Sequence, residues 1–241
     1  MRPVFILSTG RTGTDFFTRL FNEVVPEAWS LHEPRPAFRR RGQKLLAGPP
    51  SRFDIEYFRI PRMYWNRKRR EELYVETNYH LFACIPLIRK AFPEAFIVHI
   101  VRDGREVVTS WLNKWRYVNN VHMTPFHFPD HPDQAHWDEW DPLERNAWFW
   151  RTVQEVVERD GVDLTLSFER TFKGEQNGVY ELLETLGERI SYDPEEVQAL
   201  LGEKVNPRPR GFFPPYPEWP DHWKRNFERI AGRKMQELGY S

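Results

Sequence analysis

The chain has 241 residues, 40% of them hydrophobic, so it can bury a sizeable core, and one domain over residues 1–241 is the simplest expectation. Its 35 basic and 35 acidic residues cancel, so the global charge favours no class of partner. The one cysteine, Cys84, excludes an internal disulfide and fits a reducing compartment. No apolar run has the length of a membrane span, and the first predicted strand leaves no room for a signal peptide, so we expect a cytoplasmic protein.

The N-terminal stretch joins a predicted strand to a predicted helix through a loop of small residues. Residues 3–7 favour a buried strand, and a helix is expected from about residue 14 to residue 24. Such a turn directs several backbone N–H groups at one point, where anions bind. The loop consists of Gly10, Arg11, Thr12, Gly13 and Thr14. Its glycines permit close approach of the backbone, while the arginine and threonines supply a cation and two hydroxyls.

Two alternatives apply to this loop. A nucleoside-triphosphate loop, G-x-x-x-x-G-K-[ST], requires a lysine after its second glycine, and the stretch contains none. Turns rich in Gly, Ser and Thr also occur simply to make a tight connection.

A second predicted strand, residues 28–32, ends at a pair of polar residues. Polar groups beyond the C-terminal ends of parallel strands face the crevice where ligands bind. His32 and Glu33 are therefore candidates for acid–base chemistry. The alternative is a strand-end histidine and an exposed glutamate in a turn.

Residues 35–70 carry a strong local positive charge. They contain twelve Lys and Arg residues but only two acidic ones, Asp54 and Glu56. Beside an anion site, such a segment would attract an anionic cofactor or acceptor. Interleaved aromatic residues also allow a nucleic-acid-binding interpretation, and a solvated face is the simplest one.

A second candidate anion site follows a central buried strand, residues 95–102. A helix is expected from about Gly104, so Arg102 lies at the strand end and Ser110 about two turns into the helix. The two side chains can share one phosphate, through the guanidinium fork and the hydroxyl. Alternatively, Asp103 is a magnesium-binding aspartate of an NTPase.

The other expected elements alternate between strands and helices. A strand at 73–77 leads into a helix capped by Asn78 and interrupted at Pro86, and a strand at 162–168 follows a helix at 142–159. Helices are also expected at 178–188 and 194–201, before an irregular loop at 206–220. Four histidines lack the spacing and the cysteine partner of a structural zinc site, and we interpret them as loop residues: His122, His127, His131 and His136.

The two anion motifs together resemble those of sulfotransferases that use 3′-phosphoadenosine 5′-phosphosulfate (PAPS). The order small-small-Gly-Arg-Thr-Gly-Thr resembles their 5′-phosphosulfate loop, and Arg-Asp-Gly-Arg-Glu-Val-Val-x-Ser, from Arg102 to Ser110, is similar to their 3′-phosphate motif. The resemblance implies an α/β fold, a three-layer P-loop-type domain with a central parallel sheet flanked by helices.

The resemblance also implies site residues. It places Arg11, Thr12, Gly13 and Thr14, with Gly10, on the 5′-phosphate, and Arg102 and Ser110 on the 3′-phosphate. Phe16 and Phe168 fall where aromatic rings lie near adenine, and Arg210 and Gly211 loosely match a C-terminal cofactor-closing region. Asp15 departs from the pattern, in which a second Thr or Ser is usual, and would repel a phosphate if it faced inward.

The implied chemistry is in-line sulfonate transfer from PAPS to a hydroxyl or amine, without a metal. Glu33 would take the acceptor proton, with His32 as the alternate base, and Arg11 would stabilise developing charge. The expected acceptor is a small molecule or glycan, and the basic segment would suit an anionic one. Neither nucleic acid nor a membrane is expected as a partner. Two other functions stay open: a Mg-dependent nucleotide phosphotransferase or NTPase, and a non-catalytic polyanion-binding protein.

Overall fold

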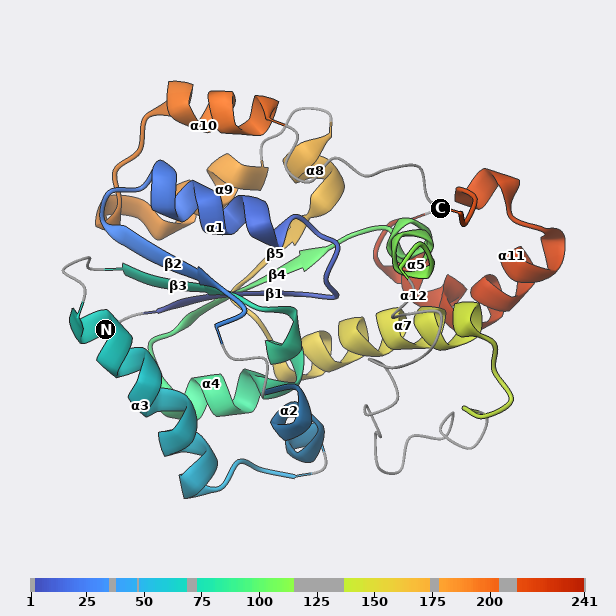
Figure 1. Cartoon of the computed structure of the whole chain (residues 1–241), viewed down its shortest axis with the longest axis horizontal. Coiled ribbons are helices and arrows are strands. Elements are labelled where there is room, and N and C mark those ends of the chain that lie inside the picture. The colour runs from blue at the N-terminus through green and yellow to red at the C-terminus, as the bar shows by residue number, and fades with distance from the viewer. Residues whose placement is uncertain are drawn as a thin grey trace.

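The five strands that the structure describes lie side by side in one parallel sheet, in the order β2-β3-β1-β4-β5 (Figure 1). They are β1 (Val4–Ser8), β2 (Ala28–His32), β3 (Leu73–Thr77), β4 (Phe96–Val101) and β5 (Leu164–Ser167). This computed structural model describes residues 3–34, 38–46, 48–68, 73–114, 137–173, 178–203 and 212–240.

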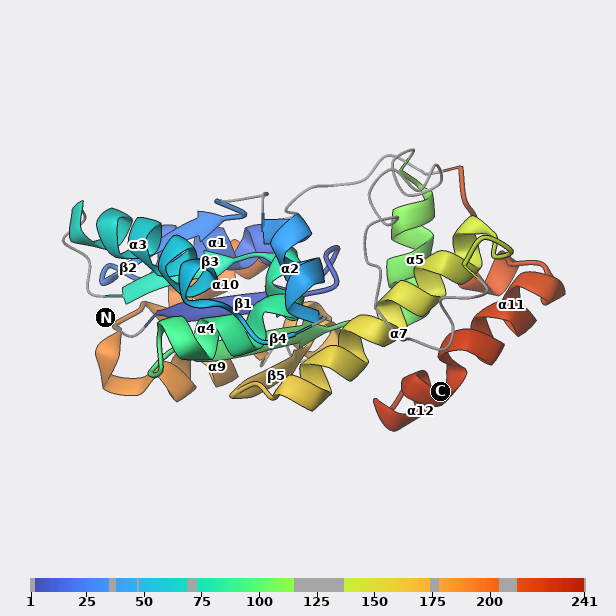
Figure 2. The ribbon, with the colours of Figure 1, turned by 90° about the horizontal axis from the view of Figure 1, so that it is seen from below.

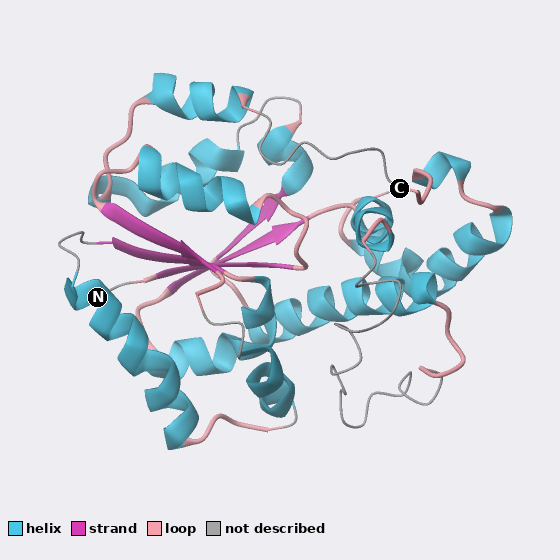
Figure 3. Cartoon of the chain, in the orientation of Figure 1, coloured by secondary structure: helices cyan, strands magenta, loops and turns pink. Residues whose placement is uncertain are grey.

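Helices cover both faces of the sheet, as the colouring by secondary structure shows (Figure 3). One face carries α1 (Thr14–Glu23), α8 (Phe168–Phe172), α9 (Gly178–Leu186) and α10 (Pro194–Gly202). The other carries α2 (Phe38–Leu46), α3 (Arg52–Lys68), α4 (Ile85–Ala91) and the long α7 (Pro142–Asp160). The predicted three-layer α/β architecture is confirmed.

A further group of helices lies at the end of the molecule towards which the strands run (Figure 2). It comprises α5 (Gly104–Leu112), α11 (Asp221–Phe227) and α12 (Arg233–Glu237), and a π-helical turn (Glu228–Gly232) joins the last two. No helix in the described ranges is both long enough and apolar enough to cross a membrane.

Alternation along β1 explains the core on both sides of the sheet. Phe5 and Leu7 pack into one hydrophobic cluster, and Val4 and Ile6 pack into the other. Successive side chains of a strand point to opposite faces, so a strand covered on both sides is apolar throughout. The apolar run at the N-terminus therefore becomes the central strand.

Asn78 and Pro86 act as the sequence analysis predicts. The Asn78 side chain accepts a hydrogen bond from the backbone N–H of His80, which caps a 3₁₀ helix at Tyr79–Cys84. Helix α4 then begins at Ile85, with Pro86 in its first turn, where a missing N–H costs little. The predicted interruption is thus a change from 3₁₀ to α-helix.

The basic segment forms two helices, α2 and α3, and several of its cations are paired. Arg41 binds Asp54 at 2.7 Å, and Arg59 binds Glu56 at 2.9 Å. The expectation of a solvated face fails for Arg62, whose side chain is fully buried. The segment therefore presents less free positive charge than its composition indicates.

Arg62 and Glu76 form a buried ion pair that joins α3 to β3. Nε and Nη2 of Arg62 donate to the two carboxylate oxygens of Glu76, both at 2.6 Å. The hydroxyl of Tyr74 and the amide of Asn78 donate to the same carboxylate, at 2.9 and 3.1 Å. Four hydrogen bonds are donated to the Glu76 carboxylate, so protein groups alone compensate its buried charge.

We predict that Glu76→Gln lowers the free energy of unfolding by about 3–5 kcal/mol, because it leaves the Arg62 charge buried and uncompensated. Urea denaturation of the purified variant measures the loss. Glu56→Gln is the matched control, since it breaks a partly exposed arginine pair worth about 1 kcal/mol or less. Equal effects of the two substitutions would contradict a stabilising role for the buried pair.

Candidate functional site

The C-terminal ends of the strands bring the predicted site residues to one edge of the sheet. The loop of residues 9–13 follows β1, His32 ends β2, and Arg102 follows β4. Since every strand pair is parallel, all of these ends face the same side. Ligands of open α/β sheets bind there.

The loop after β1 has an unusual backbone. Gly10, Arg11 and Gly13 have φ angles of 78°, 61° and 79°, in the left-handed region. Left-handed residues within a tight turn direct successive N–H groups into a concave anion-binding surface. At Gly13 a Cβ atom would lie 2.6 Å from the Phe172 ring, so only glycine fits there. The predicted strand, loop and helix are present.

Three side chains from the two anion motifs meet beside this loop. Nε of Arg11 donates to Oγ of Ser110 at 3.0 Å, and Nη1 of Arg102 donates to the backbone carbonyl of Arg11 at 2.7 Å. The indole N–H of Trp150 donates to the Arg102 carbonyl, which holds the end of β4 against α7. The structure thus brings together motifs that lie far apart in the sequence.

Two polar atoms of the site are buried without a hydrogen-bond partner in the described part of the chain. They are Oγ1 of Thr12 and Nε of Arg102. Burial lowers the pKa of Arg102, which the nearby carboxylate of Glu106 opposes, and an arginine stays protonated in this setting. Buried donors without a partner are rare, and here they fit an anionic ligand.

The two aromatic residues predicted to lie near adenine differ in their surroundings. Phe16 is only 3% exposed, and its ring packs edge-on against Phe172 at 4.9 Å, so it offers no face for stacking. Phe168 lies under the Arg102 guanidinium, 4.2 Å from Cζ to the ring centre. The apolar side of α1 draws Phe16 into the core, whereas Phe168 remains next to the second anion motif.

His32 lies between two carboxylates. Its Nε2 is 3.1 Å from Oδ1 of Asp15 and 3.6 Å from Oε1 of Glu33. Its Nδ1 is 2.8 Å from Oγ1 of Thr77, so both ring nitrogens have partners. Asp15, the residue that departs from the expected motif, therefore contacts His32 at the end of β2.

Glu33 combines strain with partial burial. Its φ of 45° is left-handed, and its N–H donates to the Thr77 carbonyl at 2.9 Å, which holds the backbone in place. Burial raises the pKa of Glu33, the charge of Asp15 adds to the rise, and His32 opposes it. Strain and partial burial of a carboxylate at a strand end make Glu33 a candidate for acid–base chemistry.

The sequence analysis missed several residues of the site. Thr77 holds His32 and Glu33, Glu106 pairs with Arg102, and Tyr79 packs beside Gly10. The sequence offers one indication of Thr77, because this residue ends β3 in the same way that His32 ends β2. Arg210, Gly211 and the histidines at 122, 127, 131 and 136 lie outside the described residues.

Asp103 has a structural role at the start of α5. Its side chain caps α5 by accepting from the Arg105 N–H, and both carboxylate oxygens accept from the Arg105 guanidinium. This pairing does not favour the interpretation of Asp103 as a magnesium ligand. Within the described ranges, no group of three or more His, Cys, Asp and Glu residues is arranged to hold a metal ion.

Two solved structures of similar architecture are sulfotransferases. A "Sulfotransferase Domain from the Curacin Biosynthetic Pathway" aligns over 100% of this chain and 99% of its own, with a TM-score of 0.60 and 11% identity. The chain has the sulfotransferase fold. The mouse sulfotransferase SULT7A1, solved with 3′-phosphoadenosine 5′-phosphate (PAP), aligns over 98% of this chain and 85% of its own, with a TM-score of 0.51 and 14% identity. No family model matches the sequence, and the comparison with curated proteins gives no match.

We predict that Gly13→Ala destabilises the protein more than Gly239→Ala does. Both residues have a φ of 79°, and Gly239 ends α12 with the hydrogen bonds of a left-handed helix cap, so the backbone cost to alanine is about 1–2 kcal/mol at each. Of the two, Gly13 is the one whose new methyl meets a ring, and overpacking adds about 1–3 kcal/mol; nothing lies within 4 Å at Gly239. Thermal unfolding followed by circular dichroism measures the difference, and equal melting temperatures would refute the close packing of the loop.

Proposed function

We propose that the protein is a PAPS-dependent sulfotransferase. The observation that carries this proposal is the meeting of Arg11, Ser110 and Arg102 beside a glycine-rich loop, within a sulfotransferase fold. The presence of PAP in the mouse neighbour supports the choice of nucleotide. A single folded domain in a cytoplasmic compartment is part of the same proposal.

The residues of the site fit a nucleotide with two separate phosphate groups. The backbone of residues 10–14, with Arg11 and Thr12, would hold the 5′-phosphosulfate, and Arg102 with Ser110 would hold the 3′-phosphate. Thr12 Oγ1 and Arg102 Nε would then gain the partners that they lack within the described chain. Each charge-assisted hydrogen bond is worth more than a neutral one, which favours binding at these buried donors.

Glu33 is our candidate for the general base. When bound, PAPS supplies the sulfonate group and leaves as PAP. The Glu33 carboxylate would accept the proton of an acceptor hydroxyl or amine, since its raised pKa makes it a better base than an exposed glutamate. His32 engages Asp15 and Thr77 through its two ring nitrogens, so we assign it to positioning the end of β2 rather than to proton transfer. Arg11 would stabilise charge on the oxygens of the transferred group.

The acceptor in this proposal is a small molecule or glycan, and no metal is required. The alternatives receive less support. The Asp103 carboxylate is engaged with Arg105, which weakens the NTPase interpretation. Arg41, Arg59 and Arg62 are paired with carboxylates, which weakens the interpretation as a binder of nucleic acid or other polyanions.

We expect calorimetry to detect metal-free binding of PAP that Arg102→Ala weakens by about a hundredfold, because a buried guanidinium contact to a phosphate is worth a few kcal/mol. Arg105→Ala is the matched control, since Arg105 follows in the same motif but is engaged with Asp103. Binding of Mg-ATP without binding of PAP would favour a phosphotransferase instead.

We expect Glu33→Gln to reduce sulfonate transfer by about 10²–10⁴-fold while the affinity for PAP is unchanged. In the parent, kcat/KM should rise with pH as Glu33 loses its proton, at a pH above the usual glutamate pKa because burial raises it. Assays of radiolabelled sulfonate transfer between pH 4 and 9, with about one measurement per pH unit, give both the loss of activity in the variant and the pH dependence of the parent. Full turnover by the variant would remove Glu33 as the base.

A further inference from the structure

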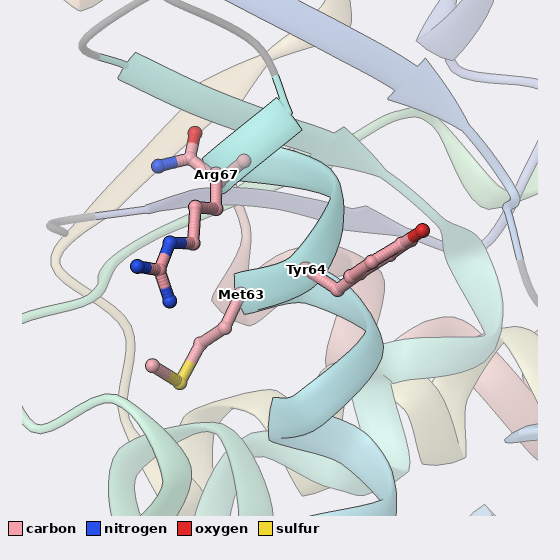
Figure 4. A pocket seen from close by; sticks show the side chains of 4 residues that line it. Met63, Tyr64 and Arg67 are labelled. Atoms are coloured by element: carbon pink, nitrogen blue, oxygen red, sulfur yellow. The ribbon is translucent and has the colours of Figure 1, made fainter.

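The described residues form a pocket on α3, apart from the candidate site (Figure 4). Met63, Tyr64, Asn66 and Arg67 line it, and none of these residues follows the end of a strand. Nothing in the described chain shows what covers the pocket, so we assign it no ligand. The contacts that carry an inference lie around Arg102, at the end of β4.

The turn after Arg102 is held through its backbone by side chains of two distant helices. The N–H of Asp103 donates to Oε1 of Glu169 at 3.3 Å, and the N–H of Gly104 donates to the sulfur of Met235 at 3.3 Å. Glu169 belongs to α8 and Met235 to α12, so elements from much later in the chain fix this strand end.

The N–H groups of this turn are not available to an anion. The next N–H, that of Arg105, donates to the Asp103 side chain at 2.8 Å. A helix N-terminus binds anions through such groups, but here side chains of the protein already occupy three in succession, from Asp103 to Arg105. An anion at this place therefore depends on the side chains of Arg102 and Ser110, and hence on how the turn holds Arg102.

Glu169 joins the two residues that stack at this site. Cζ of Arg102 lies 4.2 Å from the centre of the Phe168 ring. The next residues along the chain, Asp103 and Glu169, share the backbone-to-carboxylate hydrogen bond. That bond ties the strand end that carries the cation to the helix that carries the ring. A shift of Glu169 would therefore move the guanidinium relative to the ring and to the loop of residues 9–13, which Arg102 also contacts.

Tyr240 fixes the Glu169 carboxylate in this position. Its hydroxyl donates to Oε2 at 2.8 Å, and the Ser167 hydroxyl donates to the same oxygen at 3.1 Å, which leaves Oε1 for Asp103. Burial raises the pKa of Tyr240, and the charge of Glu169 adds to the rise, so the hydroxyl keeps its proton as the donor. The Tyr240 backbone is held in turn, because its N–H donates to the Met235 carbonyl at 2.9 Å.

We propose that Glu169 and Tyr240 are positioning residues of the nucleotide site and act through Arg102. Glu169 holds the turn so that the guanidinium meets the 3′-phosphate, and Tyr240 keeps the carboxylate directed at the turn. The inference rests on the proposed PAPS-dependent function, to which it adds two residues that govern nucleotide affinity and leave the transfer step unchanged.

The competing explanation is that the two residues only stabilise the fold. Loss of a purely stabilising contact lowers the fraction of folded protein, and with it the apparent kcat, but leaves KM and Kd of the folded molecules unchanged. Loss of a positioning contact raises KM for PAPS and Kd for PAP. It leaves kcat nearly unchanged, since Glu33 and Arg11 are not altered.

Calorimetry of PAP binding to the full chain tests the proposal with three variants. Glu169→Ala should weaken PAP binding by about tenfold, and Tyr240→Phe, which loses one hydrogen bond to a carboxylate, by about fivefold. Glu169→Gln should bind within about twofold of the parent, because its amide oxygen still accepts from Asp103 and the Tyr240 hydroxyl can accept from its NH₂ group. In transfer assays the KM for PAPS should rise by the same factors, while kcat changes by less than about twofold.

A double-mutant cycle measures whether the effect passes through Arg102. In an Arg102→Ala background, Glu169→Ala should weaken PAP binding by less than about twofold further, because the side chain that it positions is absent.

Matched controls make the same chemical changes at other places. Tyr180→Phe removes a hydroxyl that joins α9 to α10, and Glu181→Ala removes a carboxylate that contacts Arg170 on α8. Neither should change the affinity for PAP. Circular dichroism verifies that each variant folds. Tyr240→Phe keeps the ring that packs against the core, so it tests the proposal even where Glu169→Ala does not fold.

The possible failures are distinguishable. A parent chain that binds no PAP would overturn the proposed function, and this inference with it. A parent that binds PAP no better than Tyr240→Phe and Glu169→Ala do would overturn the positioning role alone. So would a Glu169→Gln variant as weak as Glu169→Ala, which assigns the effect to charge. A full further loss in the Arg102→Ala background, or a lower kcat with unchanged KM, would have the same consequence.

Discussion

The hydrogen bond from Arg102 to the backbone carbonyl of Arg11 is the contact on which the candidate site depends. It joins the end of β4 to the loop after β1, so that the two predicted anion motifs lie side by side. The parallel sheet makes this contact possible, because β1 and β4 are neighbours with their ends on the same side. Arg11, whose φ is left-handed, makes both contacts: its Nε donates to Ser110, and its backbone carbonyl accepts from Arg102. Loss of the sheet register would separate the two motifs even if each loop kept its local shape.

Much of the fold follows from local signals that the sequence carries. Strands at 28–32 and 73–77, the cap at Asn78 and the helix start at Gly104 are where periodicity and capping chemistry predict them. Burial of Arg62 could not be predicted in this way, because its partner Glu76 lies on another element and only the tertiary structure brings them together. The same reason explains Phe16: its place in the motif indicated a ligand contact, but its position on the apolar face of α1 directs it into the core.

The charged side chains around the site form two groups. Arg11 and Arg102 form a cationic centre at the loop, and Asp15, His32 and Glu33 form a mixed cluster at the end of β2. Nε2 of His32 lies 3.1 Å from the Asp15 carboxylate and 3.6 Å from the Glu33 carboxylate. Asp15 is in the first turn of α1, directly after the loop of residues 9–13, so this cluster adjoins the cationic centre. Sequence reasoning identified these residues individually, but the partnership of Asp15 with His32 required the structure.

The sheet order has a consequence for how the protein folds. Strand β1 is made first, yet its two neighbours are β3 and β4, whose residues Val75 and Phe96 pair with Val4. Contacts between residues so far apart in sequence close large loops and form slowly. During synthesis the apolar run of β1 emerges without the strands that will cover it, and exposed segments of this kind aggregate readily. Because Arg102 follows β4, the contact between the two predicted anion motifs can form only after β4 has paired with β1.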